Sequence, residues 1–119
     1  MMQDSSSSTP SSPVNWDEGI KRVAGNKALF EKLLYRIADG LPNDLASIEQ
    51  SIASGDMEAL SHAAHTLKGS AGNLSIVAVY EQSIELEAAA KENNTALAGE
   101  VLKKLEQSSA EFITYIKAL

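Results

Sequence analysis

Apolar residues recur every three or four positions from residue 14 to the end of this chain, which is the spacing of one face of an α-helix. No stretch alternates apolar and polar residues for long enough to make a β-strand. The chain is rich in Ala, Leu, Glu and Lys, which favour helices, and it holds only three prolines in 119 residues. The sequence therefore predicts an all-α fold.

Capping residues and glycines divide the pattern into one short helix and four longer ones. The residues expected to cap or start these helices are Asn15 or Asp17, Asn26, Asp56, Ser75 and Thr95. Gly25 and Gly55 are expected to end the first two helices, because glycine adopts the left-handed conformation readily. The apolar phase of the second helix continues across Pro42, which predicts one kinked helix there rather than two.

The short breaks between the longer helices predict antiparallel neighbours. Residues 14–119 are thus expected to form an up-down-up-down four-helix bundle, with the short N-terminal helix covering one end. The residues expected to point inward from the fourth helix are Ile76, Val79, Tyr80, Ile84, Leu86 and Ala90. Residues 1–13 hold six Ser, one Thr and two Pro, which predicts a disordered lead or a linker from a longer chain.

Composition excludes several classes of function. Sixteen acidic residues against ten basic ones give a net charge of −6, which disfavours nucleic acid as a partner. The absence of cysteine removes disulfides, Cys-ligated zinc, iron–sulfur clusters and thiol nucleophiles. No run of about 18 apolar residues and no signal peptide is present, so we expect no membrane contact by this domain and a cytoplasmic location.

The third helix carries the most informative polar face. At about 100° per residue, its polar side is centred on His65. The other members of this face are Glu58, Ser61, His62, Lys68, Gly69 and Gly72. Each glycine costs a helix interior about 1 kcal/mol relative to alanine. Two of them beside one histidine suggest that something large must approach the imidazole closely.

An exposed imidazole is a good nucleophile near neutral pH, and the ammonium group of Lys68 could balance the charge of a phosphoryl group. Solvated surface histidines without a function are nevertheless common. Glu58, His62 and His65 could also be taken as metal ligands. A metal site in a bundle needs inward ligands from several helices, so no metal is expected.

Residues 64–74 read A-H-T-L-K-G-S-A-G-N-L, which closely resembles the signature of histidine-containing phosphotransfer (HPt) domains. That pattern is His-x-Leu-Lys-Gly, followed by small residues and an Asn. The resemblance extends to Gly25-Asn26-Lys27 with Leu33-Leu34, and to Leu86-Glu87 with Ala89-Ala90-Lys91, and covers about residues 14–118. One departure is Ser75-Ile76, where many members have Gly-Ala.

The resemblance implies that a four-helix bundle presents His65 to receiver domains. His65 would accept a phosphoryl group from a receiver aspartate and pass it to another receiver. Lys68 would balance the phosphate charge, Gly69 would leave access beside the histidine, and Leu67 would anchor the helix in the core. The chain would be a phosphocarrier rather than an autonomous enzyme, either standing alone or fused to a hybrid sensor histidine kinase.

No Gly-rich ATP loop and no obvious acidic trio for Mg²⁺ is present in the sequence. We therefore expect no cofactor in this domain and Mg²⁺ in the receiver partner. Two alternatives stay open. One is an interaction module with the HPt fold but without phosphotransfer, and the other is an unrelated helical adaptor. Tyr35 could belong to a docking surface in any of these.

Overall fold

A computed structural model describes residues 12–119, so the Ser/Pro-rich lead predicted over residues 1–13 lies outside the described residues except for its last two. The helices are α2 (Trp16–Arg22), α3 (Lys27–Ser54), α4 (Met57–Asn73), α5 (Val77–Lys91) and α6 (Thr95–Lys117). Within residues 12–119 the extended structure amounts to one isolated β-bridge, between Val14 and Ile76. The prediction of an all-α fold is confirmed for this part of the chain.

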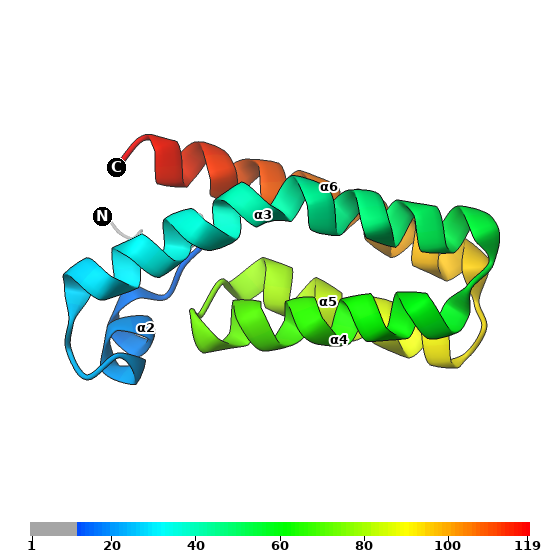
Figure 1. The fold of residues 1–119 in the computed structure, drawn as a ribbon, viewed down its shortest axis with the longest axis horizontal. Helices are drawn as coiled ribbons and strands as arrows, with labels where there is room; N and C mark the ends of the chain where they lie inside the picture. Colours follow the sequence, from blue (N-terminus) through cyan, green and yellow to red (C-terminus); the bar gives the residue numbers. More distant parts are fainter. Residues whose placement is uncertain (1–11) are drawn as a thin grey trace, which may run out of the picture.

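The four long helices lie side by side along the longest dimension of the molecule, and each one returns in the direction opposite to the helix before it (Figure 1). α4 and α5 pack closely against each other, and α3 and α6 also pack together. α2 lies at one end, where it contacts α3. In residues 12–119 no helix is long and apolar enough to cross a membrane.

Helix ends follow the capping residues closely. The side chains of four residues each accept a hydrogen bond from the backbone N–H three positions on: Asn15, Asn26, Asp56 and Asn94. Gly25 and Gly55 adopt φ angles of 81° and 72°, the left-handed conformation expected of them. α3 runs unbroken through Pro42. The sequence therefore predicted these helix limits correctly.

The start of α5 differs from the prediction. Ile76, rather than Ser75, is the N-cap, and it makes no side-chain cap bond. Ser75 instead ends the turn after α4 with a φ angle of 55°. Its buried hydroxyl donates to Glu18 Oε1 at 2.8 Å, so it ties this turn to α2. A positive φ is where glycine costs least, so Ser75 adopts a conformation that a glycine at this position would take more easily.

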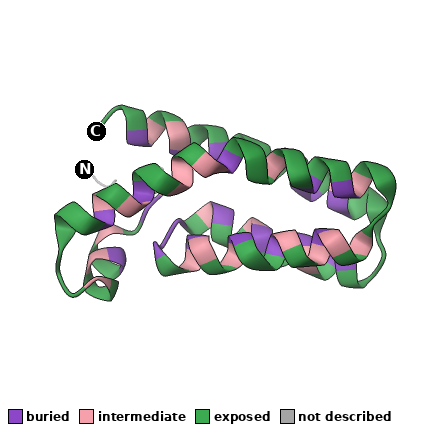
Figure 2. Ribbon diagram, in the orientation of Figure 1, coloured by how far each residue is buried: buried purple, intermediate pink, exposed green. Residues whose placement is uncertain are grey.

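Large apolar side chains form the core of the domain. Figure 2 marks the buried positions along the helices in purple. Each long helix contributes fully buried residues: Phe30, Leu34, Leu41 and Ile48 from α3, Leu60 from α4, Leu86 from α5, and Leu105, Phe112 and Ile116 from α6. Leu67 is also buried, as expected. Tyr80 and Ile84 were wrongly expected in this core, because 39% and 41% of their surfaces are exposed.

α2 is fixed at the end of the molecule by aromatic contacts. The ring of Trp16 meets Phe30 edge to face, with 5.3 Å between centroids. Its indole N–H donates to the Tyr115 hydroxyl at 2.6 Å, which joins α2 to α6. Gly19 faces the Phe30 ring so closely that an added Cβ would overlap it. α2 is therefore a packed part of the domain.

Candidate functional site

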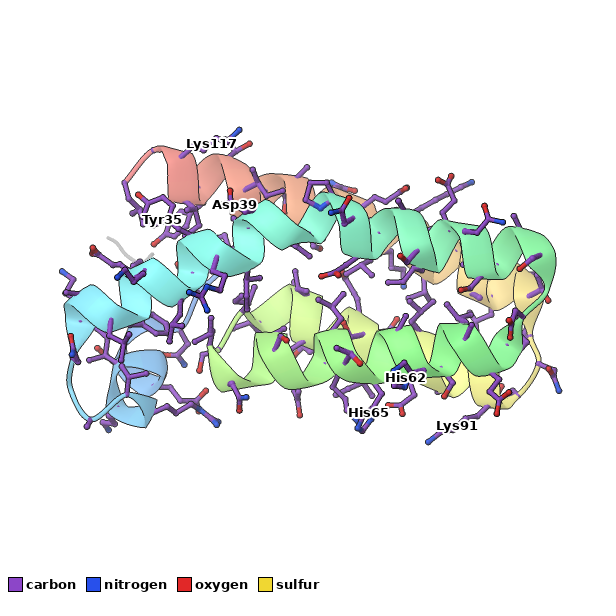
Figure 3. The ribbon with its side chains drawn as sticks, in the orientation of Figure 1. Tyr35, Asp39, His62, His65, Lys91 and Lys117 are labelled. Atoms are coloured by element: carbon purple, nitrogen blue, oxygen red, sulfur yellow. The ribbon has the colours of Figure 1, made fainter. Side chains whose placement is uncertain are left out.

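His65 lies near the middle of α4 with 65% of its side chain exposed. Its imidazole points outward, on the same side of the molecule as His62 (Figure 3). Leu60, Ala64 and Leu67 on the other faces of the same helix are buried in the core. The helix is therefore amphipathic in the phase that the sequence predicts, and its core contacts fix the direction in which His65 faces.

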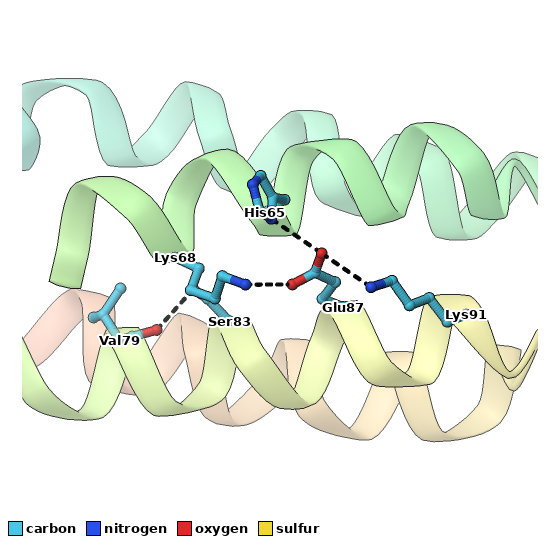
Figure 4. A network of polar contacts seen from close by, with 6 residues as sticks. All are labelled: His65, Lys68, Val79, Ser83, Glu87 and Lys91. Atoms are coloured by element: carbon cyan, nitrogen blue, oxygen red, sulfur yellow. Dashed lines mark hydrogen bonds and ion pairs between the residues drawn. The ribbon is translucent and has the colours of Figure 1, made fainter.

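A carboxylate on the neighbouring helix organises the groups around His65. Glu87, on α5, places Oε2 3.1 Å from the imidazole Nδ1 (Figure 4). Its other oxygen, Oε1, accepts a hydrogen bond from Lys68 Nζ at 2.9 Å. Lys91 Nζ lies 3.6 Å from Oε2. One carboxylate thus contacts three basic side chains, and only 12% of the Glu87 side chain is exposed.

The pKa of Glu87 is held below the usual carboxyl range. The hydrogen bond from Lys68 is the largest cause, and it outweighs the partial burial that would raise the pKa. Glu87 is therefore ionised at neutral pH and acts only as an acceptor. A neutral imidazole beside it carries its proton on Nδ1, which leaves the Nε2 lone pair free.

The two glycines of α4 serve different purposes. A Cβ added at Gly69 would meet no neighbouring atom within 4 Å among the described residues beyond its own turn of helix, so the surface beside His65 is open there. A Cβ at Gly72 would come within 2.9 Å of the Tyr80 ring. The interpretation that Gly72 also leaves room for a partner is wrong, because the ring of Tyr80 already occupies that space.

Sequence reasoning did not single out Glu87 or Lys91, which it quoted only as part of the family resemblance. The sequence signal for these two residues was weak. The two residues stand four positions apart on one helix, which allows a pair on a single face. Nothing in the sequence fixes how α5 is rotated against α4, and that rotation decides whether Glu87 reaches His65.

Other candidate residues lie apart from this cluster. Tyr35 is 44% exposed, but it projects near α6, away from the His65 face (Figure 3). Over residues 12–119, no three His, Asp or Glu side chains are grouped so as to hold a metal ion. Lys68 and Gly69 do lie beside His65, as the helical spacing requires.

Known proteins share both the sequence pattern and the fold. A family model described as "Hpt domain" matches residues 32–115, which is well over half of the chain. No curated protein matches the chain. Histidine-containing phosphotransfer protein B from Pseudomonas aeruginosa superimposes with a TM-score of 0.82 at 21% identity, over 92% of this chain and 95% of its own.

A second solved structure is the HPT domain from a sensor hybrid histidine kinase of Shewanella. It superimposes with a TM-score of 0.72 at 20% identity, over 90% of this chain and 96% of its own. At these identities the two structures establish the fold. With the family-model match, which includes His65, Lys68 and Gly69, they lead to one conclusion: the chain belongs to the Hpt domain family.

Proposed function

We propose that this domain is a histidine phosphocarrier of a phosphorelay, which accepts a phosphoryl group on His65 from a receiver-domain aspartate and passes it to another receiver. The observation that carries the proposal is the exposed imidazole whose Nδ1 faces an ionised carboxylate. That contact fixes the ring and leaves Nε2 as the nucleophile that faces solvent.

The transfer step follows from this geometry. The Nε2 lone pair attacks the phosphorus of the aspartyl phosphate, an N–P bond forms, and the P–O bond to the aspartate breaks. The aspartate leaves as a carboxylate with the bonding electrons. The ring then carries positive charge, which the carboxylate of Glu87 balances at Nδ1. Transfer to the next receiver runs the same step in reverse.

Lys68 has a second role in this proposal. Its ammonium group is bonded to Glu87 at 2.9 Å, and its side chain is 30% exposed. A phosphoryl group on Nε2 would offer it a second acceptor one helical turn away. Lys91 also pairs with Glu87, so the carboxylate keeps one cation if Lys68 turns toward the phosphate.

The domain supplies a positioned nucleophile, and the partner supplies the remaining chemistry. We assign Mg²⁺ to the receiver, because phosphoryl transfer needs charge neutralisation beyond one lysine. The scaffold is an antiparallel up-down-up-down bundle of α3 to α6 that spans the domain at residues 14–119, with α2 covering one end. Its place in the relay is either a separate carrier or part of a hybrid sensor kinase.

Labelling tests the proposal directly. Phosphorylated receiver domains from the same source are incubated with the wild type, His65→Gln and His62→Ala. We expect label on the wild type and on His62→Ala, none on His65→Gln, and a linkage that is labile to acid but stable to base. Binding without label would favour the interaction module instead. A base-labile product would identify an acyl phosphate and exclude His65 as the acceptor.

A further inference from the structure

The two carboxylate oxygens of Glu87 have different partners (Figure 4). Oε1 accepts a hydrogen bond from Lys68 Nζ at 2.9 Å. Oε2 lies 3.1 Å from the imidazole Nδ1 of His65 and 3.6 Å from the Nζ of Lys91. His65 and Lys91 therefore share one oxygen, which they reach from different helices. Each of them reduces the negative charge that this oxygen offers to the other.

Lys91 is held at this oxygen by its own helix. It lies in the last turn of α5, four residues after Glu87. Glu followed by Lys four positions later is the favourable order for an ion pair on a helix, and a helix C-terminus stabilises a cation. The Lys91 side chain is 67% exposed, so it fills no place in the core. Its removal should therefore leave the fold intact.

Three helices place charged or titratable groups around this contact. Those on α4 and α5 are His62, His65, Lys68 and Lys91. α6 also packs against α5, and there its Lys104 pairs with Glu85 at 3.8 Å. In the proposed function Lys68 turns toward the phosphoryl group. Lys91 is then the cation that stays with Glu87.

A carboxylate beside an imidazole has two opposite effects on nucleophilic attack. It orients the ring, but its negative charge also favours the imidazolium form, which is protonated on both nitrogens. That form has no lone pair on Nε2 with which to attack phosphorus. A cation at the same carboxylate oxygen weakens the second effect and keeps the first. Lys91 occupies that place beside Oε2 of Glu87.

We propose that Lys91 is a positioning residue that acts on His65 through Glu87. It lets the carboxylate orient the imidazole while the ring stays neutral at physiological pH, with the Nε2 lone pair available. The inference rests on the proposed function, in which that lone pair attacks phosphorus. A domain without this cation would reach a reactive His65 only at a higher pH.

An NMR titration of the imidazole tests the proposal without any phosphoryl donor. The chain has two histidines, so His62→Ala leaves only the ring signals of His65. In that background Lys91→Met should move the pH midpoint of these signals upward by about half a unit, the scale of an exposed ion pair. Lys91→Arg should restore the original midpoint. Lys104→Met is the matched control, because it removes the same charge from the pair with Glu85 and should leave the midpoint in place.

Labelling measures the consequence for reactivity. Phosphoramidate, a small molecule, phosphorylates histidine without needing a protein surface. Dividing the Lys91→Met rate by the wild-type rate at each pH cancels the titration of phosphoramidate itself. The variant should label about threefold more slowly below the midpoint and should reach the wild-type rate in alkaline solution, where both rings are neutral. In a Glu87→Gln background Lys91→Met should lose this pH dependence, because no carboxylate then links the two residues. Thermal unfolding verifies that each variant is folded.

The outcomes are distinct. An unchanged midpoint in Lys91→Met, or an equal shift in Lys104→Met, overturns the role of Lys91 but leaves the proposed function standing. A rate lowered equally at every pH also overturns it, because the substitution then acts on the fold or on access to His65. A shift that persists in full beside Glu87→Gln excludes action through the carboxylate. A wild type that receives no label from any receiver contradicts the proposed function itself, and the ring titration still decides whether Lys91 acts on the imidazole.

Discussion

Glu87 contacts the imidazole of His65 and the ammonium group of Lys68 across the α4–α5 interface, and the ammonium group of Lys91 on its own helix. Because its pKa is lowered, the ionised form stabilises the fold above the ordinary carboxyl pKa, and this contribution disappears as pH falls through the lowered value. The thermal midpoint of the wild type should therefore exceed that of Glu87→Gln at pH 7, and the difference should vanish in acid. A difference that grew on acidification would contradict the assigned sign.

Substitutions at Gly69 test whether the surface beside His65 must stay open for a partner, independently of how α4 packs. Its Cβ position is open, so Gly69→Ala should raise the stability of α4 by up to about 1 kcal/mol. Gly69→Leu should also fold but should block transfer from a receiver, because its side chain would occupy the approach to His65. Thermal midpoint and transfer rate are measured on the same protein. A stable and fully active Gly69→Leu would show that transfer does not require an open surface at this position.

At the scale of elements, Gly19 allows α2 to pack closely against α3. Any side chain there meets the Phe30 ring, which also contacts Trp16. Gly19→Ala should therefore destabilise the domain by about 1–3 kcal/mol, the usual cost of an overpacked core. Gly99→Ala is the control, since a Cβ at Gly99 would meet no neighbouring atom within 4 Å in the described part of the chain. Equal midpoints for the two variants in chemical denaturation would show that α2 moves freely.

At the level of elements, the sequence predicted what local chemistry controls. Asn26, Asp56 and Gly55 set helix ends through their own side chains or backbone, so each was found from the sequence. The errors arose where tertiary contacts decide. Tyr80 and Ile84 have the apolar character of core residues, but α5 has apolar side chains on both faces, and periodicity alone cannot choose between the two faces.

The same distinction between local and tertiary control applies to the residues of the candidate site. His65, Lys68 and Gly69 share one helix, so their proximity follows from 3.6 residues per turn. Glu87 reaches them from another helix, and its contact depends on how α4 and α5 pack. That packing is set by the whole core rather than by any short motif, which is why the spacing of residues could not reveal it.

For the molecule as a whole, α2 lies outside the part that the family model matches, since the match begins at residue 32. A chain shortened to residues 26–119 should keep its helical circular dichroism spectrum and the labelling of His65 by phosphoramidate. It should unfold at a lower temperature, because Phe30 loses the cover of Trp16. Complete unfolding of this shortened chain would mean that α2 is required for the fold.

The ion pairs around Glu87 also have a consequence for the order of events. The chain carries a net charge of −6, yet this cluster has two ammonium groups against one carboxylate while the imidazole is neutral. A phosphoryl group on Nε2 adds about two negative charges at its oxygens and one positive charge on the ring, so the net charge of the cluster falls from +1 to about zero. Under the proposed function, the empty site would attract a phosphorylated receiver, and the loaded site would lose that attraction. The cluster would thereby disfavour an unproductive complex in which both partners already carry phosphate.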